Sequence, residues 1–231
     1  MPLTRILNPH DVPVAGTDAH LPALPAPALT ASALRQRFVQ TQPWLPEFPG
    51  DGGLWPGRKP AHAAVLVPLV LRDDVLHVLL TRRPDHRRDH AGQVSCPGGR
   101  REAGDADPAA TALREAEEEV GLPRHRVEVI GRMPDYTTVT HFVVTPVVAL
   151  VQPPFELALD RFEVAEAFEV PLPFLMNPAH HRRHVFSFEG GQRQFLSMPW
   201  QGAGADGVSR EYFIWGATAA MLRNLYRFLA G

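Results

Sequence analysis

The run GGRREAGDADPAATALREAEEEVGL, residues 98–122, carries most of the information in this chain of 231 residues. Asp107 and Pro108 predict a helix start, because aspartate caps helix N-termini and proline fits the first helical position. The next twelve residues, 109–120, contain many alanines and no helix breaker, and Gly121 follows where a C-terminal stop is expected. The sequence therefore predicts a helix over residues 109–120 that follows a glycine turn.

The two sides of this predicted helix differ. At about 100° per residue, one side holds the apolar residues Ala109, Leu113, Ala116 and Val120. Glu115, Glu118 and Glu119 fall together on the other side within roughly 100°, and Glu117 points away from them. A hard divalent cation such as Mg²⁺ would remove the repulsion among the three carboxylates. The same cluster also fits a merely solvated acidic face.

The end of the run, REAEEEVGL at residues 114–122, fits the Nudix-box ending REUXEEXGU, where U is an aliphatic or small apolar residue. The chain thus resembles the Nudix hydrolases. This resemblance implies an α/β fold, an α/β/α sandwich with a mixed sheet, and a Nudix box over residues 99–122. The common box reads GX5EX7REUXEEXGU. Here Asp105 takes the first acidic position and eight residues separate it from Arg114, so the box is one residue longer.

The preceding run LLTRRPDHRRDHAGQVSCPGG, residues 79–99, narrows the resemblance. It is similar to the signature LLTxR[SA]xxxRxxxGxxxFPGG of the coenzyme A pyrophosphatase branch of Nudix hydrolases. Two positions differ: Pro84 replaces the small residue and Cys96 replaces the phenylalanine. The matching positions are Leu79, Leu80, Thr81, Arg83, Arg88, Gly92, Pro97, Gly98 and Gly99. The resemblance implies hydrolysis of coenzyme A, or an acyl or oxidised form, to 3′,5′-ADP and 4′-phosphopantetheine.

The resemblance also implies roles for individual residues. Glu115 and Glu119 would be the principal ligands of Mg²⁺ or Mn²⁺, with Glu118 bound directly or through water and the Gly99 carbonyl nearby. Glu115 or Glu118 would orient or deprotonate the attacking water, and Arg114 would hold a box carboxylate in place. The residues expected to bind substrate are Arg83, Arg88, Gly98 and Gly99. A glutamate from a late loop serves as general base in some Nudix enzymes, and Glu163 and Glu166 are candidates.

Arginines cluster just before the glycine turn. Arginine suits bidentate contacts to phosphate, and coenzyme A carries a pyrophosphate and a separate 3′-phosphate. Arg83 and Arg88 occupy the signature positions and are expected to bind these groups. Arg82 and Arg87 are expected to be solvated loop charges.

Composition restricts the partners and the compartment. The net charge of −2 does not suggest nucleic-acid binding. A single cysteine excludes an intrachain disulfide and suits a reducing cytoplasm. The best apolar run, residues 63–71, is far too short to span a membrane. A small-molecule substrate is therefore the expected partner, and a homodimer is a family-level expectation only.

The chain divides near residue 60. Residues 1–60 hold 11 of the 24 prolines and read as an extended arm with a short helix at 32–39, packed on the domain or on a partner subunit. Residues 61–231 form the expected Nudix domain. Strands are predicted at 63–71, 75–81, 126–132 and 142–151. Further helices are predicted at 172–176 and near the C-terminus, where Met221, Leu222, Leu225 and Phe228 form the buried stripe.

Three alternatives remain at the level of sequence. The first is a Nudix hydrolase of another substrate, such as ADP-ribose, NADH or a dinucleoside polyphosphate. The second is a non-catalytic Nudix-fold regulator, against which the intact REUXEE acids argue. The third is a protein whose acidic helix is purely structural. Metal-dependent phosphate release separates the first from the other two.

Overall fold

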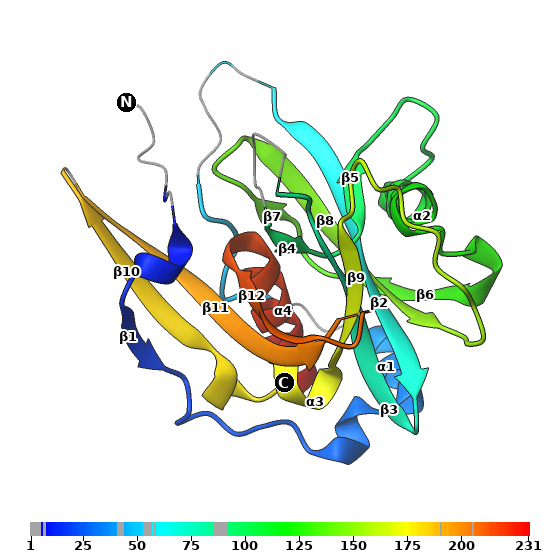
Figure 1. Ribbon diagram of the computed structural model, residues 1–231, viewed down its shortest axis with the longest axis horizontal. Coiled ribbons are helices and arrows are strands. Elements are labelled where there is room, and N and C mark those ends of the chain that lie inside the picture. The colour runs from blue at the N-terminus through cyan, green and yellow to red at the C-terminus, as the bar shows by residue number, and fades with distance from the viewer. Residues whose placement is uncertain are drawn as a thin grey trace.

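Two β-sheets form the frame of the protein (Figure 1). The computed structural model describes residues 6, 8–40, 44–52, 57, 59–85, 92–189, 191–204 and 206–231. The larger sheet has the strand order β4-β3-β2-β8-β6, with β5, β7 and β9 paired to β2, β8 and β3. The smaller sheet has the order β1-β10-β11-β12.

The elements have the following bounds. The strands are β1 Val14–Thr17, β2 Ala61–Arg72, β3 Val75–Arg82, β4 Val94–Ser95, β5 Gly98–Arg100, β6 Val127–Arg132, β7 Tyr136–Thr137, β8 Phe142–Val151, β9 Glu166–Pro171, β10 Arg182–Phe188, β11 Gly191–Ala203 and β12 Ser209–Trp215. The α-helices are α1 Ala31–Val39, α2 Pro108–Val120, α3 Leu172–Leu175 and α4 Gly216–Ala230. Short 3₁₀ turns lie at Pro9–Asp11, Ala26–Leu29, Arg124–Arg126 and Pro178–His180.

The centre of the larger sheet is a parallel pair, β2 and β8, in register from Ala61 opposite Phe142 to Val70 opposite Val151. The other pairings in this sheet are antiparallel, so the sheet is mixed as predicted. Strands buried on both faces read as continuous apolar runs, which explains why β2 and β8 were visible in the sequence. The predicted strands at 63–71, 75–81, 126–132 and 142–151 are all confirmed, within one or two residues at most ends.

Helix α2 covers one face of the larger sheet (Figure 1). The Asp107 side chain accepts a hydrogen bond from the Ala110 amide, and Gly121 ends the helix in the left-handed conformation at φ 67°. The inward side chains, including Ala112, Ala116 and Val120, pack on residues of β2, β3 and β8. The sequence-predicted helix is therefore confirmed at both ends.

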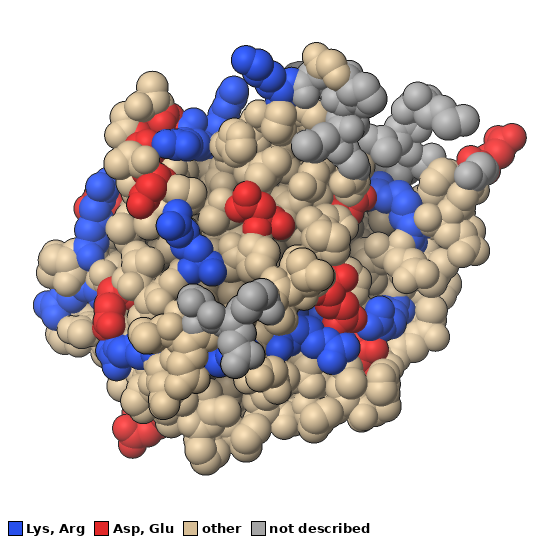
Figure 2. All heavy atoms as spheres, turned by 180° about the vertical axis from the view of Figure 1, so that it is seen from behind, with Lys and Arg blue, Asp and Glu red and all other residues tan. Residues whose placement is uncertain are grey.

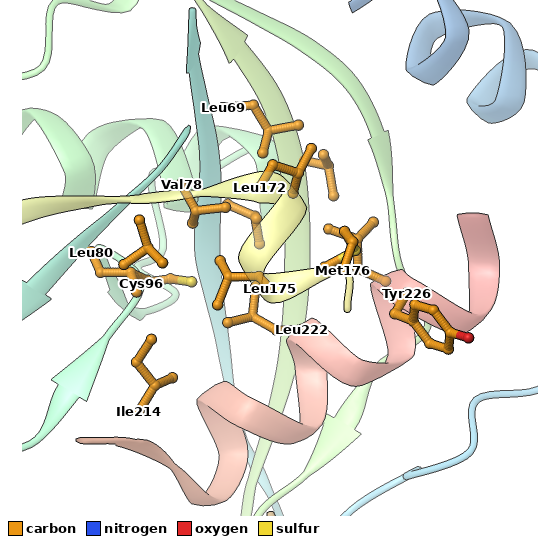
Figure 3. Packing of buried hydrophobic residues seen from close by; sticks show 14 of the residues in the cluster. Leu69, Val78, Leu80, Cys96, Leu172, Leu175, Met176, Ile214, Leu222 and Tyr226 are labelled. Carbon is orange, nitrogen blue, oxygen red and sulfur yellow. The ribbon is translucent and has the colours of Figure 1, made fainter. Parts of the chain in front are cut away.

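The opposite face of the larger sheet carries the main core, with α1, α3, α4 and the smaller sheet packed against it. In Figure 3, Leu69 and Val78 of the sheet meet Leu172 and Leu175 of α3 and Leu222 of α4. The predicted helices at 172–176 and near the C-terminus are confirmed. Of the predicted stripe, Met221, Leu222 and Leu225 are buried and Phe228 is partly buried. The protein thus has the predicted α/β sandwich, to which the smaller sheet adds a part that the sequence did not predict.

The proline-rich arm packs on this same core. Leu34 and Phe38 of α1 are buried in it, as is Leu29, and β1 pairs antiparallel with β10. The predicted helix at 32–39 is confirmed. The proposed domain boundary at residue 60 stays a prediction.

The surface offers no obvious basic field on the face that Figure 2 shows, where acidic and basic side chains are interspersed. This agrees with the small net charge of −2. No helix in the part of the chain that the structure describes is long and apolar enough to cross a membrane.

Candidate active site

The glycine turn passes directly over helix α2. Strand β5 begins at Gly98 and pairs with residues 63–65 of β2. Gly98 has a φ of 157°, and a Cβ there would collide with the Ala64 carbonyl. A Cβ on Gly99 would collide with the carboxylate of Glu115. Both positions thus need glycine, and at Gly99 the Glu115 carboxylate occupies the space that a side chain would take.

Glu119 is the most deeply placed acid of the helix, with 7% of its surface exposed. Burial, together with the negative charges of Glu115 and Glu163, raises the pKa of Glu119 to about 7. A hydrogen bond from the Gly98 amide, 3.2 Å from Oε2, and the positive charge of Arg83 act in the opposite direction. The carboxylate therefore lies in a site that its protein partners only partly compensate.

Glu115 lies one helical turn earlier, and 15% of its side chain is exposed. Burial raises the pKa of Glu115 although an ion pair with Arg114 lowers it, and the charges of Glu118 and Glu163 add to the rise. Glu163 thus acts electrostatically on both helix acids. We refer to Glu115, Glu119 and Glu163 as the carboxylate cluster.

The segment that bears Glu163 is tied to the end of α2. The Asp160 amide donates to the Glu119 carbonyl at 2.9 Å, and the Ala158 amide donates to the Val120 carbonyl at the same distance. The Glu163 amide in turn donates to the Asp160 carbonyl at 3.0 Å. These backbone bonds hold a loop about forty residues away in sequence against the acidic end of the helix.

The carboxylate cluster fits a divalent cation by its chemistry. Its donors are all oxygens, its charges repel one another, and the side-chain-free Gly99 backbone lies directly against the Glu115 carboxylate. Among the described residues, no group of three or more His, Cys, Asp or Glu side chains forms a ready-made metal site. Mg²⁺ is usually bound by one or two carboxylates together with substrate phosphates and water, so such a pre-formed cage is not required.

Arg114 is held by a separate set of acceptors. Its guanidinium forms two hydrogen bonds with the Asp105 carboxylate, at 3.1 and 3.0 Å, and one with the Arg100 carbonyl at 3.0 Å. It also pairs with Glu118 at 2.8 Å and with Glu115 at 3.0 Å. The Arg114 hydrogen bonds, together with those from the Glu102 amide and the Thr111 hydroxyl, hold the pKa of Asp105 well below its usual range.

The first acidic position of the box is therefore engaged with Arg114. The sequence placed Asp105 in the box but gave it no role. Helical periodicity could not predict its contact with Arg114, because Asp105 lies before the helix and Arg114 lies within it. The structure shows a chain of contacts from Asp105 through Arg114 to Glu115. The predicted ion pair between Arg114 and a box carboxylate is present.

The remaining helix acids lie toward solvent. Glu118 exposes 58% of its side chain and contacts Arg114. Glu117 pairs with Arg124 on the surface at 2.7 Å, in agreement with its predicted direction away from the other acids. The structure thus brings Glu115 and Glu119 together and leaves Glu118 at the rim.

Arg83 follows strand β3 and approaches the cluster closely enough for its charge to lower the pKa of Glu119. Its amide donates to the Gln93 carbonyl at 3.0 Å, but its buried Nε has no hydrogen-bond partner in the described structure. A buried donor of this kind is rare, because leaving it unpaired costs about 1–3 kcal/mol. Arg87 and Arg88 lie outside the described residues.

Two interpretations from the sequence change here. Arg82 was expected to be a solvated loop charge, and this is wrong: it pairs with Asp85 at 3.1 Å and with buried Glu166 at 3.5 Å. Of the two late glutamates, Glu166 is engaged by three side chains and only Glu163 acts on the helix acids. The sequence alone could not distinguish the roles of Glu163 and Glu166, because the Arg210 and Tyr212 partners of Glu166 come from the distant strand β12.

Comparisons with known proteins agree with this geometry. The model of the NUDIX domain family matches residues 60–187. A protein named uncharacterized Nudix hydrolase NudL from Escherichia coli K12 is 41% identical over 164 residues, which cover 71% of this chain and 80% of the relative. NudL of Salmonella paratyphi B is 43% identical over the same shares.

Solved structures show weaker likeness. The crystal structure of the Nudix hydrolase RenU from M. smegmatis aligns with a TM-score of 0.43 and 24% identity, over 50% of this chain and 73% of that one. A MutT/nudix family protein from Enterococcus faecalis aligns with a TM-score of 0.44 and 15% identity, over 87% and 70%. Membership of a family therefore rests on the sequence matches.

The mixed sheet, the glycine turn and the acid-bearing helix define the Nudix fold. The chain belongs to the Nudix family. It is a Nudix pyrophosphohydrolase, of a family that binds small molecules containing a linked nucleoside diphosphate and typically uses a divalent metal.

Proposed function

We propose that this protein hydrolyses the pyrophosphate of coenzyme A, or of an acyl or oxidised form, with Mg²⁺ or Mn²⁺. Two observations carry the proposal: a partly buried carboxylate cluster whose charge is only partly compensated, and a nearby buried Arg83 Nε without a hydrogen-bond partner among the described residues. A phosphate-containing substrate bound together with a divalent cation would supply both missing partners: the cation for the carboxylates and a phosphate oxygen for Arg83. The coenzyme A signature over residues 79–99 supports the choice of substrate.

In the proposed site, Glu115 and Glu119 hold the cation, with the Gly99 carbonyl close by and Glu118 contributing directly or through water. When bound, a divalent cation would lower the pKa of water and neutralise negative charge on the reacting phosphates. Arg114 fixes the direction of the Glu115 carboxylate through its bonds to Asp105.

The proton and the phosphates have proposed acceptors of their own. Oxygen of a water forms the new bond to phosphorus, the bridging P–O bond breaks, and the leaving phosphate takes the electron pair. Glu163 accepts the proton of the water, because its charge acts on both helix acids and its loop is anchored to the helix end. Arg83 binds a phosphate oxygen beside the Gly98–Gly99 turn, and Arg88 is assigned to the 3′-phosphate by its signature position.

The test is chromatographic. Purified protein with coenzyme A and Mg²⁺ or Mn²⁺ should release 3′,5′-ADP in a metal-dependent manner, faster than it cleaves ADP-ribose, NADH or diadenosine polyphosphates. Turnover of one of those substrates instead would keep the Nudix chemistry and overturn the choice of coenzyme A. No turnover of any of them would favour a regulatory role.

A pair of substrates tests the 3′-phosphate assignment. Arg88→Ala should raise the KM for coenzyme A about tenfold while leaving the KM for dephospho-coenzyme A nearly unchanged, since one charge-assisted contact contributes about 1.5–3 kcal/mol. Equal losses on both substrates would remove this role from Arg88.

A further inference from the structure

Glu166, at the start of β9, is a buried carboxylate whose two oxygens are both engaged. The Tyr212 hydroxyl donates to Oε1 at 2.8 Å, and Nη1 of Arg210 donates to both oxygens at 3.2 and 3.0 Å. Nε of Arg82 reaches Oε2 at 3.5 Å. Burial and the bond to Glu166 raise the pKa of Tyr212 to about 12, so its hydroxyl stays a donor.

These contacts join the two sheets beside the candidate active site. Arg82 ends β3 directly before Arg83, and its carbonyl accepts from the Ala165 amide at 2.9 Å. Arg210 and Tyr212 belong to β12 of the smaller sheet. The Tyr212 ring also stacks on Phe168 of β9, with 3.7 Å between ring centroids. One carboxylate thus connects β3, β9 and β12.

We propose that Glu166 is a positioning residue. Held by Arg210 and Tyr212 of the smaller sheet, it sets the distance between Arg83 and Glu163. Glu163 lies three residues before Glu166, and Arg83 lies one residue after Arg82. Both side chains therefore extend from segments that the Ala165–Arg82 backbone bond and the Glu166 carboxylate join. Arg82 also pairs with Asp85, two residues beyond Arg83, at 3.1 Å. The inference rests on the proposed function of Glu163 and Arg83.

The interaction is costly to disturb, which suits a positioning device. A buried carboxylate that loses a donor is left with unmet charge, and its segment relaxes to find water or another partner. Displacements of about 1 Å in a catalytic arrangement can reduce a rate as much as about a hundredfold. The smaller sheet therefore influences the reaction without contact to the reacting atoms.

The same strand supplies a matched control. Glu169 of β9 pairs with Arg72 through three hydrogen bonds of 2.7–3.3 Å, at the far end of β2 from the glycine turn. Both acids join β9 to the rest of the larger sheet by arginine. Of these two ion pairs, only that of Glu166 lies next to the segments that carry Arg83 and Glu163.

The experiment compares Glu166→Gln, Tyr212→Phe and Arg210→Ala with Glu169→Gln, at a temperature where each variant is folded. Tyr212→Phe and Arg210→Ala should lower kcat/KM about tenfold, and Arg210→Lys should recover part of the loss. Hydrogen exchange should quicken in segments 81–85 and 160–165 of these variants. Glu169→Gln should leave kcat/KM and the exchange of both segments within about twofold of the wild type. If Glu166→Gln does not fold, the β12 variants decide the question.

Unchanged kcat/KM with unchanged exchange in the β12 variants would overturn the proposal, as would an equal effect of Glu169→Gln. If the wild type cleaves no substrate of the panel, the proposed function is wrong. Hydrogen exchange then still tests whether Glu166 positions the segments that carry Arg83 and Glu163. Faster exchange in both segments, absent from Glu169→Gln, would then support the positioning role, and its absence would overturn it.

Discussion

Two groups of partly or fully buried charged side chains in this molecule are built in opposite ways. The carboxylate cluster of Glu115, Glu119 and Glu163 gathers like charges, and the pKa of Glu119 rises to about 7. A second group, the ion-pair cluster, joins the N-terminal arm to the smaller sheet and α4. Its members are Asp18, Glu47, His181, Arg183, Arg223 and Arg227.

Glu47 in the ion-pair cluster shows the contrast. Burial raises its pKa, but hydrogen bonds from Arg223 and Arg227 outweigh this, and with Arg183 they lower the pKa to about 2. The three arginines lie 2.8, 2.6 and 2.9 Å from its oxygens. Arg223 itself is fully buried.

The difference teaches where to look for function. A protein that needs an acid in its interior only for structure surrounds it with donors, as the ion-pair cluster does for Glu47. Acids left together with raised pKa values in a site are candidates for binding or catalysis, because a ligand supplies the missing charge. The following predictions test this contrast, from the largest expected effect to the smallest.

Glu119→Gln should reduce metal-dependent turnover by about a thousandfold and leave the fold intact. The substitution removes a proposed cation ligand, but it also removes a buried charge that the protein compensates poorly. Rates measured by chromatography and thermal melting without metal check both parts. Glu117→Gln, on the exposed side of the same helix, is the control and should keep nearly full activity. Near wild-type turnover in Glu119→Gln would contradict the assignment.

Glu47→Gln makes the same chemical change in the ion-pair cluster and should do the reverse. It should lower the free energy of unfolding by about 3 kcal/mol, because three arginines, one of them fully buried, lose their charged partner. The intrinsic kcat of the folded fraction should be unchanged. Urea denaturation measures the first quantity. A stability equal to that of the wild type would show that the cluster does not hold the arm.

The ion-pair cluster should also make the protein sensitive to acid. Burial, with the positive charges of Arg223 and His180, lowers the pKa of His181 from 6.5 to about 4, against the opposing effects of Asp18 and of a hydrogen bond to the Leu175 carbonyl. The unfolded chain therefore binds a proton at His181 that the folded chain refuses, and stability falls as pH drops below 6.5. Glu47 adds a loss as pH falls from 4.5 towards 2.

Between pH 6.5 and about 5, His181 should cost roughly 2 kcal/mol, at about 1.4 kcal/mol per pH unit. The measurement is urea denaturation across this range in Glu119→Gln, since the raised pKa of Glu119 has the opposite sign in the same window. His181→Gln in that background is the control and should flatten the slope. If stability still fell with pH in the His181→Gln control, a group other than His181 would be responsible for the loss.

The sequence predicted the parts of the fold that depend on local signals. The α2 helix has an aspartate cap, a proline and a terminal glycine, and β2 and β8 are apolar throughout, so each was visible without its partners. The smaller sheet was not predicted, because β10 and β11 mix arginine, glutamine and serine with aromatic residues and show no clear alternation.

The candidate site divides in the same way. Glu115 and Glu119 follow from spacing on one helix, and Gly98 and Gly99 follow from the motif. The pairing of Asp105 with Arg114 and the separation of Glu163 from Glu166 depend on which chain segments meet. Such contacts belong to tertiary structure, so one sequence leaves them open.

Glu118→Gln gives the smallest expected effect and tests how closely burial predicts importance within the box. Glu118 exposes 58% of its side chain and already has Arg114 as a partner, whereas Glu115 exposes 15% and belongs to the carboxylate cluster. Glu118→Gln should therefore reduce turnover about tenfold, equivalent to about 1.4 kcal/mol, and Glu115→Gln should reduce it far more. Rates at saturating Mg²⁺ and at saturating Mn²⁺ check the order. A loss for Glu118→Gln equal to that for Glu119→Gln would mean that Glu118 turns inward when cation and substrate bind. The burial and ion pairing of these acids in the free protein would then not predict their order of importance for turnover.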